Sequence, residues 1–207
     1  MNKTVIISGG SQGIGKALVK KFLQEGFAVF TCSRNKEKLD ALSTEFNTTS
    51  LHTFVADLSI KKQCQDFAGW VLGQTKSIDV LINNAGFFMP GQIQNEEDGV
   101  LESQIEANLY SAYHLTRAFL PTFQAQKSGH IFTICSTASI TAYTAGGSYC
   151  ISKFALLGFT KVLREETKTQ GIKVTAILPG ATLTPAWDGV ELPESRFIPA
   201  DDVASTI

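Results

Sequence analysis

The chain is 207 residues long, which is enough for one domain with a sizeable core and too short for two. Its net charge is −1 and its lysines and arginines form no basic run, so a nucleic-acid partner is not expected. No apolar stretch approaches the roughly 18 residues of a membrane span, and we expect residues 1–207 to form a single cytoplasmic domain without a membrane partner.

The four cysteines are far apart in the sequence and form no Cys-x-x-Cys pair. Most of them lie in or beside apolar segments, which favours reduced, buried thiols. The three histidines have no metal-ligand spacing among themselves or with the cysteines. We therefore predict no metal site.

Apolar runs of strand length alternate with helical patterns along the chain. The expected strands cover residues 4–8, 27–32, 51–56, 80–82, 131–135 and 172–178. The expected helices cover about 14–24, 36–46, 60–75, 95–107, 108–126 and 149–169, and another begins near residue 200. Apolar strands between helices indicate a parallel sheet that is covered on both faces. The crossover rule then favours an α/β fold of Rossmann type, a doubly wound parallel sheet in three αβα layers with strand order 3-2-1-4-5-6.

A glycine-rich turn joins the first expected strand to the first expected helix. It reads Ser8-Gly9-Gly10-Ser11-Gln12-Gly13-Ile14-Gly15. Glycines in this position let backbone amides approach an anion at the helix N-terminus, so the turn predicts a phosphate site. Its candidate residues are Gly9, Ser11, Gln12, Gly13, Ile14 and Gly15. A tight turn without a ligand is the alternative.

Tyr149 and Lys153 are four residues apart in a segment with a helical pattern. In a helix, this spacing puts the phenol and the ammonium on one face. A nearby positive charge lowers the pKa of a tyrosine from about 10 and makes the phenol a usable acid or base. The alternative is an ordinary helix with a buried aromatic ring and a lysine that reaches the solvent.

The glycine spacing, the run Asn83-Asn84-Ala85-Gly86 and Tyr149-x-x-x-Lys153 together resemble the single-domain short-chain dehydrogenase/reductases. The resemblance covers nearly the whole chain and has the motifs in the family's order. It implies a Rossmann-type fold and hydride transfer between a nicotinamide cofactor and a small-molecule carbonyl or secondary alcohol. The protein would supply orientation and electrostatics, because the hydride chemistry belongs to the cofactor.

The resemblance also implies a catalytic set of Asn108, Ser136, Tyr149 and Lys153. Tyr149 would be the general acid or base, Ser136 would hold and polarise the substrate oxygen, and Lys153 would bind the cofactor's ribose and lower the tyrosine pKa. Asn108 would hold a water that connects the lysine to solvent, and a kink or cap in a helix is the alternative for this residue. Thr137 and Ser139 are interpreted as loop hydroxyls that cap backbone groups.

The residues after the second strand distinguish between the two nicotinamide cofactors. A carboxylate there binds the ribose 2′-hydroxyl of NAD, whereas an arginine accommodates the 2′-phosphate of NADP. The sequence has Ser33 and Arg34 and no carboxylate before Glu37, so NADP(H) is preferred over NAD(H). A solvated loop arginine is the alternative. By resemblance, the cofactor also contacts Asp57, Leu58, Asn83, Ala85, Gly86, Tyr149, Lys153, Pro179, Gly180, Thr182 and Thr184.

Several large side chains on segments near the expected strand ends favour an apolar or aromatic carbonyl substrate. They are Phe87, Phe88, Met89, Tyr143, Trp187 and Phe197.

Residues 181–199 are expected to form a loop. The family continues beyond the helix near residue 200 with a seventh strand, which we expect this chain to lack. The long helices at 108–126 and 149–169 are expected to pair between copies in a homodimer or homotetramer.

Two other functions fit part of the pattern. A non-catalytic NADP(H)-binding or sensing protein could use the same fold, but the complete catalytic set argues against it. An epimerase or dehydratase of the extended branch also uses a Tyr-x-x-x-Lys pair. The glycine spacing and the lack of a large carboxy-terminal substrate domain argue against that function.

Overall fold

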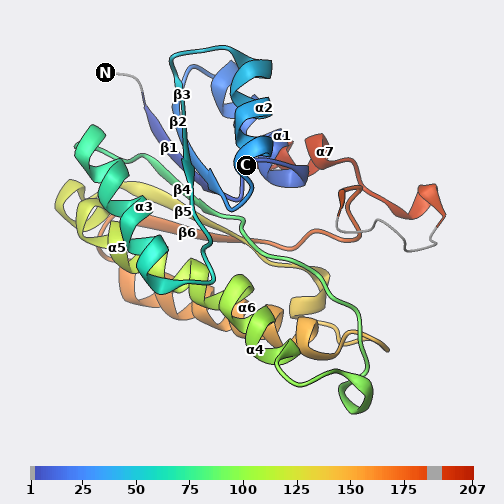
Figure 1. Ribbon diagram of the computed structural model, residues 1–207. Coiled ribbons are helices and arrows are strands. Elements are labelled where there is room, and N and C mark those ends of the chain that lie inside the picture. Colours follow the sequence, from blue (N-terminus) through green and yellow to red (C-terminus); the bar gives the residue numbers. More distant parts are fainter. Residues whose placement is uncertain (1–2, 186–192) are drawn as a thin grey trace.

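The computed structural model describes residues 3–185 and 193–207, which form a parallel sheet between two layers of helices (Figure 1). Within these residues the sheet has six strands in the order β3-β2-β1-β4-β5-β6. This order confirms the predicted doubly wound α/β fold. The strands are β1 (Thr4–Ser8), β2 (Ala28–Ser33), β3 (Leu51–Val55), β4 (Val80–Asn83), β5 (Gly129–Ile134) and β6 (Ile172–Ile177).

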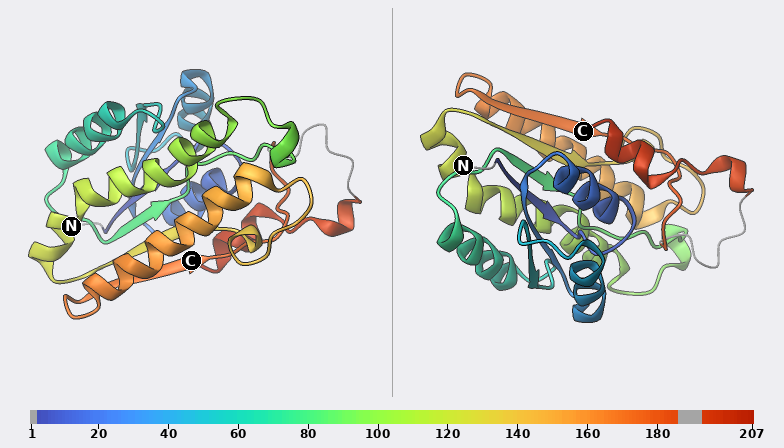
Figure 2. Two further views of the ribbon diagram at one scale, coloured as in Figure 1. Left: turned by 90° about the horizontal axis from the view of Figure 1, so that it is seen from below. Right: turned by 90° about the horizontal axis from the view of Figure 1, so that it is seen from above.

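Helices cover both faces of the sheet, as two further views show (Figure 2). One face carries α1 (Gly13–Gln24), α2 (Lys36–Phe46) and the short α7 (Ala200–Ser205). The opposite face carries α3 (Lys61–Gln74), α5 (Ser111–Gln126) and α6 (Gly147–Thr167). Helices α5 and α6 lie side by side, and the centroids of the Tyr113 and Phe159 rings are 5.9 Å apart across their contact.

The two cores on either side of the sheet explain the continuous apolar runs of the sequence. All five residues of β1 are buried. Ile6 packs in one core with Phe67 and Phe119, whereas its neighbours Val5 and Ile7 pack in the other. Successive side chains of a strand point to opposite faces. A strand that is covered on both sides must therefore be apolar along its whole length.

The segment before α5 differs from the two helices predicted at 95–107 and 108–126. A 3-10 turn covers Ile93–Asn95, and α4 extends only from Val100 to Ile105. Gly99 separates them with a φ of 90°, a left-handed conformation that favours glycine. A π-helical turn, η2 (Glu106–Tyr110), then joins α4 to α5. The predicted helix boundary between residues 107 and 108 therefore falls inside a continuous helical segment.

The described ends of the predicted loop at 181–199 pair with each other. The N–H of Ile198 donates to the carbonyl of Ala181 at 2.8 Å, and the N–H of Leu183 donates to that of Ile198 at 2.9 Å. A 3-10 turn covers Glu194–Arg196. Trp187, which was predicted near the substrate, lies outside the described residues.

The predicted burial of the cysteines is confirmed, because all four are buried and free. In the described part of the chain, none of the helices combines the length and the apolarity needed to cross a bilayer. The same residues contain no group of histidine, cysteine, aspartate and glutamate side chains that could hold a metal ion.

Candidate active site

A cleft of about 310 Å³ lies at the carboxyl ends of the strands. A parallel sheet gathers the segments that follow its strands at one edge, where doubly wound folds bind their ligands. Most of the predicted cofactor residues line this cleft. They are Gly9, Ser11, Gln12, Gly13, Ile14, Gly15, Ser33, Arg34, Asp57, Leu58, Ala85, Gly86, Lys153 and Thr184.

The glycine-rich turn brings the N-terminus of α1 to this cleft. Gly9 and Gly13 have φ values of 72° and 54°, which residues with side chains rarely adopt. A methyl group on Gly15 would lie 2.1 Å from the carbonyl oxygen of Gly9, so the turn needs a glycine there. The N-cap residue Gln12 makes no side-chain hydrogen bond to the helix. The first N–H groups of α1 are thus available to an anion.

Ser8 and Asn84 hold the glycine turn against the end of β4. The Ser8 hydroxyl accepts from the backbone N–H groups of Asn84 and Ala85, each at 2.9 Å. The Asn84 side chain donates to the carbonyl of Ser8 at 2.9 Å and to that of Gly9 at 3.1 Å. Asn84 also lines the cleft, although the predicted set contains its two neighbours and omits it.

Asn83 lies in the core rather than in the cleft. Its side chain is buried, and its amide donates to the Thr116 hydroxyl on α5 at 2.9 Å. Its Oδ1 has no hydrogen-bond partner among the described residues. These contacts join β4 to α5 and give Asn83 an architectural position. Asn83 does not line the cleft, and its predicted contact with the cofactor stays a prediction.

The end of β2 presents Ser33 and Arg34 to the cleft. Ser33 Oγ accepts from the Ser11 hydroxyl at 2.9 Å and from the N–H of Asn35 at 3.3 Å, which ties this strand end to the glycine turn. Arg34 is exposed. Its guanidinium forms no ion pair within residues 3–185 and 193–207. A guanidinium in this state can bind a phosphate group.

Asp57 and Leu58 line the cleft directly after β3. Asp57 Oδ1 accepts from the N–H of Ser59 at 3.0 Å and from its hydroxyl at 2.7 Å. The N–H of Asp57 donates to Gln63 Oε1 at 2.7 Å. The carboxylate therefore stabilises the turn into α3 and forms part of the cleft wall.

The segment after β6 reaches the cleft through Thr184. Pro179, Gly180 and Thr182 do not line it. The Thr182 side chain is buried, and its hydroxyl donates to the carbonyl of Gly180 at 3.1 Å. Contacts of these three residues with a cofactor stay predictions.

The first turn of α6 brings Tyr149 next to Ser136. Burial raises the pKa of Tyr149 above its usual value, and a hydrogen bond with the Ser136 hydroxyl opposes this rise. Lys153 Nζ lies 5.8 Å from the centroid of the Tyr149 ring. The expected net fall of the tyrosine pKa is wrong for this structure, because burial raises it and Lys153 is not among the groups that shift it here. Stabilisation of the phenolate by the lysine during a reaction stays a prediction.

Lys153 is buried and lines the cleft. Its Nζ donates to the carbonyl of Ile134, the last residue of β5, at 3.0 Å. Burial lowers the pKa of Lys153 to about 8. The lysine therefore stays mostly charged at neutral pH, and it connects the cleft to the neighbourhood of Tyr149.

Ser136 follows β5 and caps a 3-10 turn over Thr137–Ser139. Its hydroxyl accepts from the N–H of Ala138 at 3.1 Å, and the hydroxyl of Ser139 accepts from the N–H of Ser136 at 3.2 Å. The interpretation of Ser139 as a capping hydroxyl is confirmed.

Asn108 is buried in the π-helical turn η2, and π turns often occur at functional sites. Its Oδ1 accepts from the N–H of Phe87 at 2.9 Å, and its Nδ2 donates to the carbonyl of Phe87 at 3.1 Å. Nδ2 also donates to Ser152 Oγ at 2.9 Å, and that hydroxyl donates to the carbonyl of Tyr149 at 2.8 Å. The side chain thus links three segments, while a water held by the Asn108 backbone stays a prediction.

The cleft has further lining residues that the sequence reasoning missed. They are Cys32, Ala56, Ser59, Asn84, Ala107, Ile134 and Pro185, and Phe87, which was predicted to face the substrate, lines the cleft as well. Most of them directly precede or follow a predicted site residue at a strand end. Their positions next to the ends of predicted strands could have identified these residues, whereas their chemical types could not.

Comparison with known proteins decides the family. A family model described as short chain dehydrogenase matches residues 3–194. The chain belongs to this family of oxidoreductases. Its curated relatives include the uncharacterized oxidoreductase YvrD of Bacillus subtilis, 36% identical over 183 residues, which are 88% of this chain and 69% of the relative. Dehydrogenase/reductase SDR family member 6 of Rattus norvegicus is 34% identical over 185 residues, 89% of this chain and 73% of its own length.

Solved structures of the family share the fold. The structure described as ElxO with NADP bound has a TM-score of 0.92 and 26% identity, and the match covers 100% of this chain and 90% of that one. A short-chain dehydrogenase/reductase family oxidoreductase from Burkholderia thailandensis has a TM-score of 0.89 and 26% identity, with 100% and 84% of the two chains covered. The resemblance stated from the motifs is thus confirmed.

Proposed function

We propose that the protein is an NADP(H)-dependent oxidoreductase that interconverts a carbonyl group and a secondary alcohol. The proposal rests on the meeting of Tyr149, Ser136 and Lys153 beside a cleft with a glycine turn. An acid, a hydroxyl that can hold an oxygen, and a cation are the groups that the protonation of a substrate oxygen needs.

Tyr149 is suited to donate a proton during carbonyl reduction. Because burial raises its pKa, the phenol keeps its proton at neutral pH until a substrate oxygen gains negative charge. The Ser136 hydroxyl would hold that oxygen next to the phenol. Lys153, which is mostly protonated below pH 8, would stabilise the phenolate that remains.

The cleft residues fit a dinucleotide with an additional phosphate. The Gln12 side chain does not cap the N-terminus of α1, which leaves its N–H groups for a phosphate. Arg34 lines the cleft at the position where a carboxylate would repel a 2′-phosphate and an arginine can bind it. NADPH bound there would supply the hydride. The similar structure of ElxO has NADP bound, which supports NADP(H) over NAD(H).

An apolar or aromatic carbonyl compound is the proposed substrate. The rings of Phe88 and Tyr149 are in a T-shaped contact, with centroids 4.8 Å apart. Met89, which follows Phe88, and Tyr143, which precedes α6, are exposed. A substrate oxygen that reaches the phenol would therefore pass an aromatic and apolar wall.

The proposal is tested with a panel of aldehydes, ketones, quinones and diketones, with loss of NADPH absorbance as the readout. At least one compound should be reduced, and Tyr149→Phe should lower its turnover by about 100- to 10,000-fold with NADPH binding retained. Tyr113→Phe, at an exposed phenol on α5 that does not line the cleft, is the matched control and should keep its turnover. NADPH binding without turnover of any compound would favour the non-catalytic binding protein instead.

A further inference from the structure

The carboxylate of Glu96 ties the segment between β4 and α4 to the start of α6. Oε1 accepts from the backbone N–H of Ser148 at 2.9 Å, and Oε2 accepts from the Ser148 hydroxyl. Ser148 is the second residue of α6 and directly precedes Tyr149. Glu96 thus holds the helix at the turn that carries the proposed acid.

Helix α6 needs this acceptor because its own N-cap provides none. Gly146 has no side chain, and no side-chain hydrogen bond from that position caps the helix, although the first N–H groups of a helix lack partners within it. The helix dipole also favours a carboxylate at this end. In the described ranges Glu96 forms no ion pair, so the helix end rather than a cation balances its charge.

Two glycines make room for the Glu96 side chain. A methyl group on Gly147 would lie 2.1 Å from its Oε1, and one on Gly91 would lie 2.8 Å from its Cγ. The N–H of Gly91 donates to the carbonyl of Ala145 at 2.9 Å, and Ala145 has a left-handed φ of 62°. A residue other than glycine keeps such a conformation only where its surroundings hold it. The contact between Glu96 and α6 is therefore part of a tightly fitted junction.

The same segment also places an aromatic ring against Tyr149. Phe88 makes the T-shaped contact with the phenol described above, at an interplanar angle of 75°. On one side of Phe88, Asn108 holds the backbone of Phe87. On its other side, the carbonyl of Met89 accepts from the side chain of Gln104 at 3.3 Å. Glu96 adds an anchor that reaches α6 itself.

We propose that Glu96 is a positioning residue for Tyr149, an inference that rests on the function proposed above. By joining the first turn of α6 to the segment that carries Phe88, Glu96 sets the direction of the phenol through its backbone and its ring. Because the glycine turn and Arg34 belong to other segments, loss of this carboxylate should misplace the phenol and leave NADPH binding intact.

Kinetics of Glu96 variants test the inference. Glu96→Ala should lower kcat by about 10- to 100-fold, the effect of a misplaced catalytic group, with the Kd for NADPH unchanged. Glu96→Gln, which keeps an acceptor oxygen, should fall between Glu96→Ala and the wild type. Glu97→Ala, at the exposed neighbouring residue, is the control and should keep full kcat. A wild-type kcat in Glu96→Ala would overturn the inference.

Ser148→Ala removes only the hydroxyl donor and provides a second test. It should lower kcat in the wild-type background and have no further effect on kcat in Glu96→Ala, because residues that act as a pair are not additive. Equal effects of Ser148→Ala in both backgrounds would mean that the pair does not act through this contact and would overturn the inference.

A spectroscopic readout separates this inference from the proposed function. In protein with ¹³C-labelled tyrosine rings, the Tyr149 signal is assigned by its loss in Tyr149→Phe. It should shift or split in Glu96→Ala and stay in place in Glu97→Ala. If the wild type reduces no carbonyl compound but the signal moves as expected, the proposed function fails and the positioning by Glu96 holds. A Tyr149 signal that does not respond to Glu96→Ala overturns the inference.

Discussion

Lys153 is a buried cation that costs the folded protein stability. Burial lowers its pKa from 10.5 to about 8, and each pKa unit corresponds to about 1.4 kcal/mol. The folded state is therefore destabilised by roughly 3 kcal/mol below pH 8. Between pH 8 and 10.5 the unfolded chain binds more protons than the folded one, so the free energy of unfolding rises with pH in this window. Such a cost is expected where a charge serves function rather than stability.

Lys153→Met should raise the free energy of unfolding at pH 7 by up to roughly 3 kcal/mol and abolish turnover. The difference in the free energy of unfolding between the variant and the wild type should shrink as the pH rises from 8 to 10.5. In this window the buried lysine of the folded wild type becomes neutral, and burying it no longer destabilises the protein. Denaturant titrations at pH 7 and pH 10 measure this difference. Lys161→Met, at an exposed position of the same helix, should show neither effect. A variant less stable than the wild type at pH 7 would contradict this account.

Arg34 is the residue on which the preference for NADP(H) depends. Arg34→Glu replaces a cation that would pair with the 2′-phosphate by an anion that repels it, and a hydrogen bond to a charged group contributes about 1.5–3 kcal/mol. The Kd for NADPH should rise by about 10-fold or more, and NADH should become the tighter ligand. Fluorescence titrations with both nucleotides measure the change. Lys76→Glu, at an exposed site that precedes β4 and so lies at the amino ends of the strands, away from the cleft, is the charge-matched control. Unchanged affinities in Arg34→Glu would remove Arg34 from the binding site.

At the scale of single elements, the turn before α1 depends on the absence of a side chain at Gly15. In Gly15→Ala the new methyl group would meet the backbone oxygen of Gly9, which cannot move aside as a flexible side chain can. The variant should lose about 1–3 kcal/mol of stability and bind NADPH much more weakly. Thermal unfolding and nucleotide titration measure both effects.

Gly158→Ala is the matched control for this substitution. Gly158 lies inside α6, and beyond the adjacent turns of the helix itself a methyl group there would meet no described atom within 4 Å. The change should therefore stabilise the protein by about 1 kcal/mol through helix propensity alone and leave nucleotide binding as it is. If both glycine variants behaved alike, the close approach at Gly15 would not be the cause.

The sheet could be predicted from the sequence because each central strand is buried on both faces. Val5, Ile6 and Ile7 form a continuous apolar run, which is typical of a parallel strand that is covered on both faces. The helices between β4 and α5 could not be predicted as well, because Gly99 and the π turn at 106–110 interrupt the 3.6-residue period. The pattern of apolar residues in a sequence does not reveal the left-handed conformation of a glycine or the extra residue of a π-helical turn.

The candidate site was predictable where a motif is local and was missed where contacts are distant. Tyr149 and Lys153 are on one helix, so their spacing is visible in the sequence. Glu96 and Ser148 are in contact although they are 52 residues apart in the sequence, and no local pattern indicates this pair. The pKa of Tyr149 was predicted in the wrong direction for a related reason, since its burial depends on segments from elsewhere in the chain.

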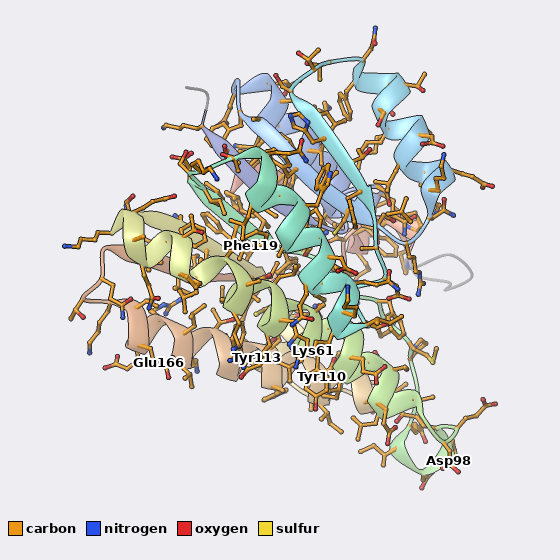
Figure 3. The ribbon with its side chains drawn as sticks, turned by 60° about the vertical axis from the view of Figure 1, so that its left-hand side comes forward. Lys61, Asp98, Tyr110, Tyr113, Phe119 and Glu166 are labelled. Carbon is orange, nitrogen blue, oxygen red and sulfur yellow. The ribbon has the colours of Figure 1, made fainter. Side chains whose placement is uncertain are left out.

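At the scale of the whole molecule, the end of η2 together with α5 and α6 carries an exposed apolar stripe. The large exposed side chains on this layer are Tyr110, Tyr113, Ile151, Phe154 and Val162. Tyr110 and Tyr113 are visible on the outer side of the helices (Figure 3). On α6 the residues follow helical spacing and so share one face. We propose that two copies pair through this stripe, since contiguous exposed apolar surface marks association sites.

Ile151→Asp and Phe154→Asp should turn a dimer of the wild type into a monomer. Burial of a large apolar side chain stabilises an interface by about 1.5–3 kcal/mol, and a carboxylate in its place would have to be desolvated. Sedimentation velocity at several protein concentrations measures the change. Val55→Asp, at a similarly exposed residue of the edge strand β3 (49% exposed), is the control and should stay dimeric. Because the stripe lies outside the cleft, the monomeric variants should still bind NADPH. A wild type that sediments as a monomer at all concentrations would contradict the proposed pairing.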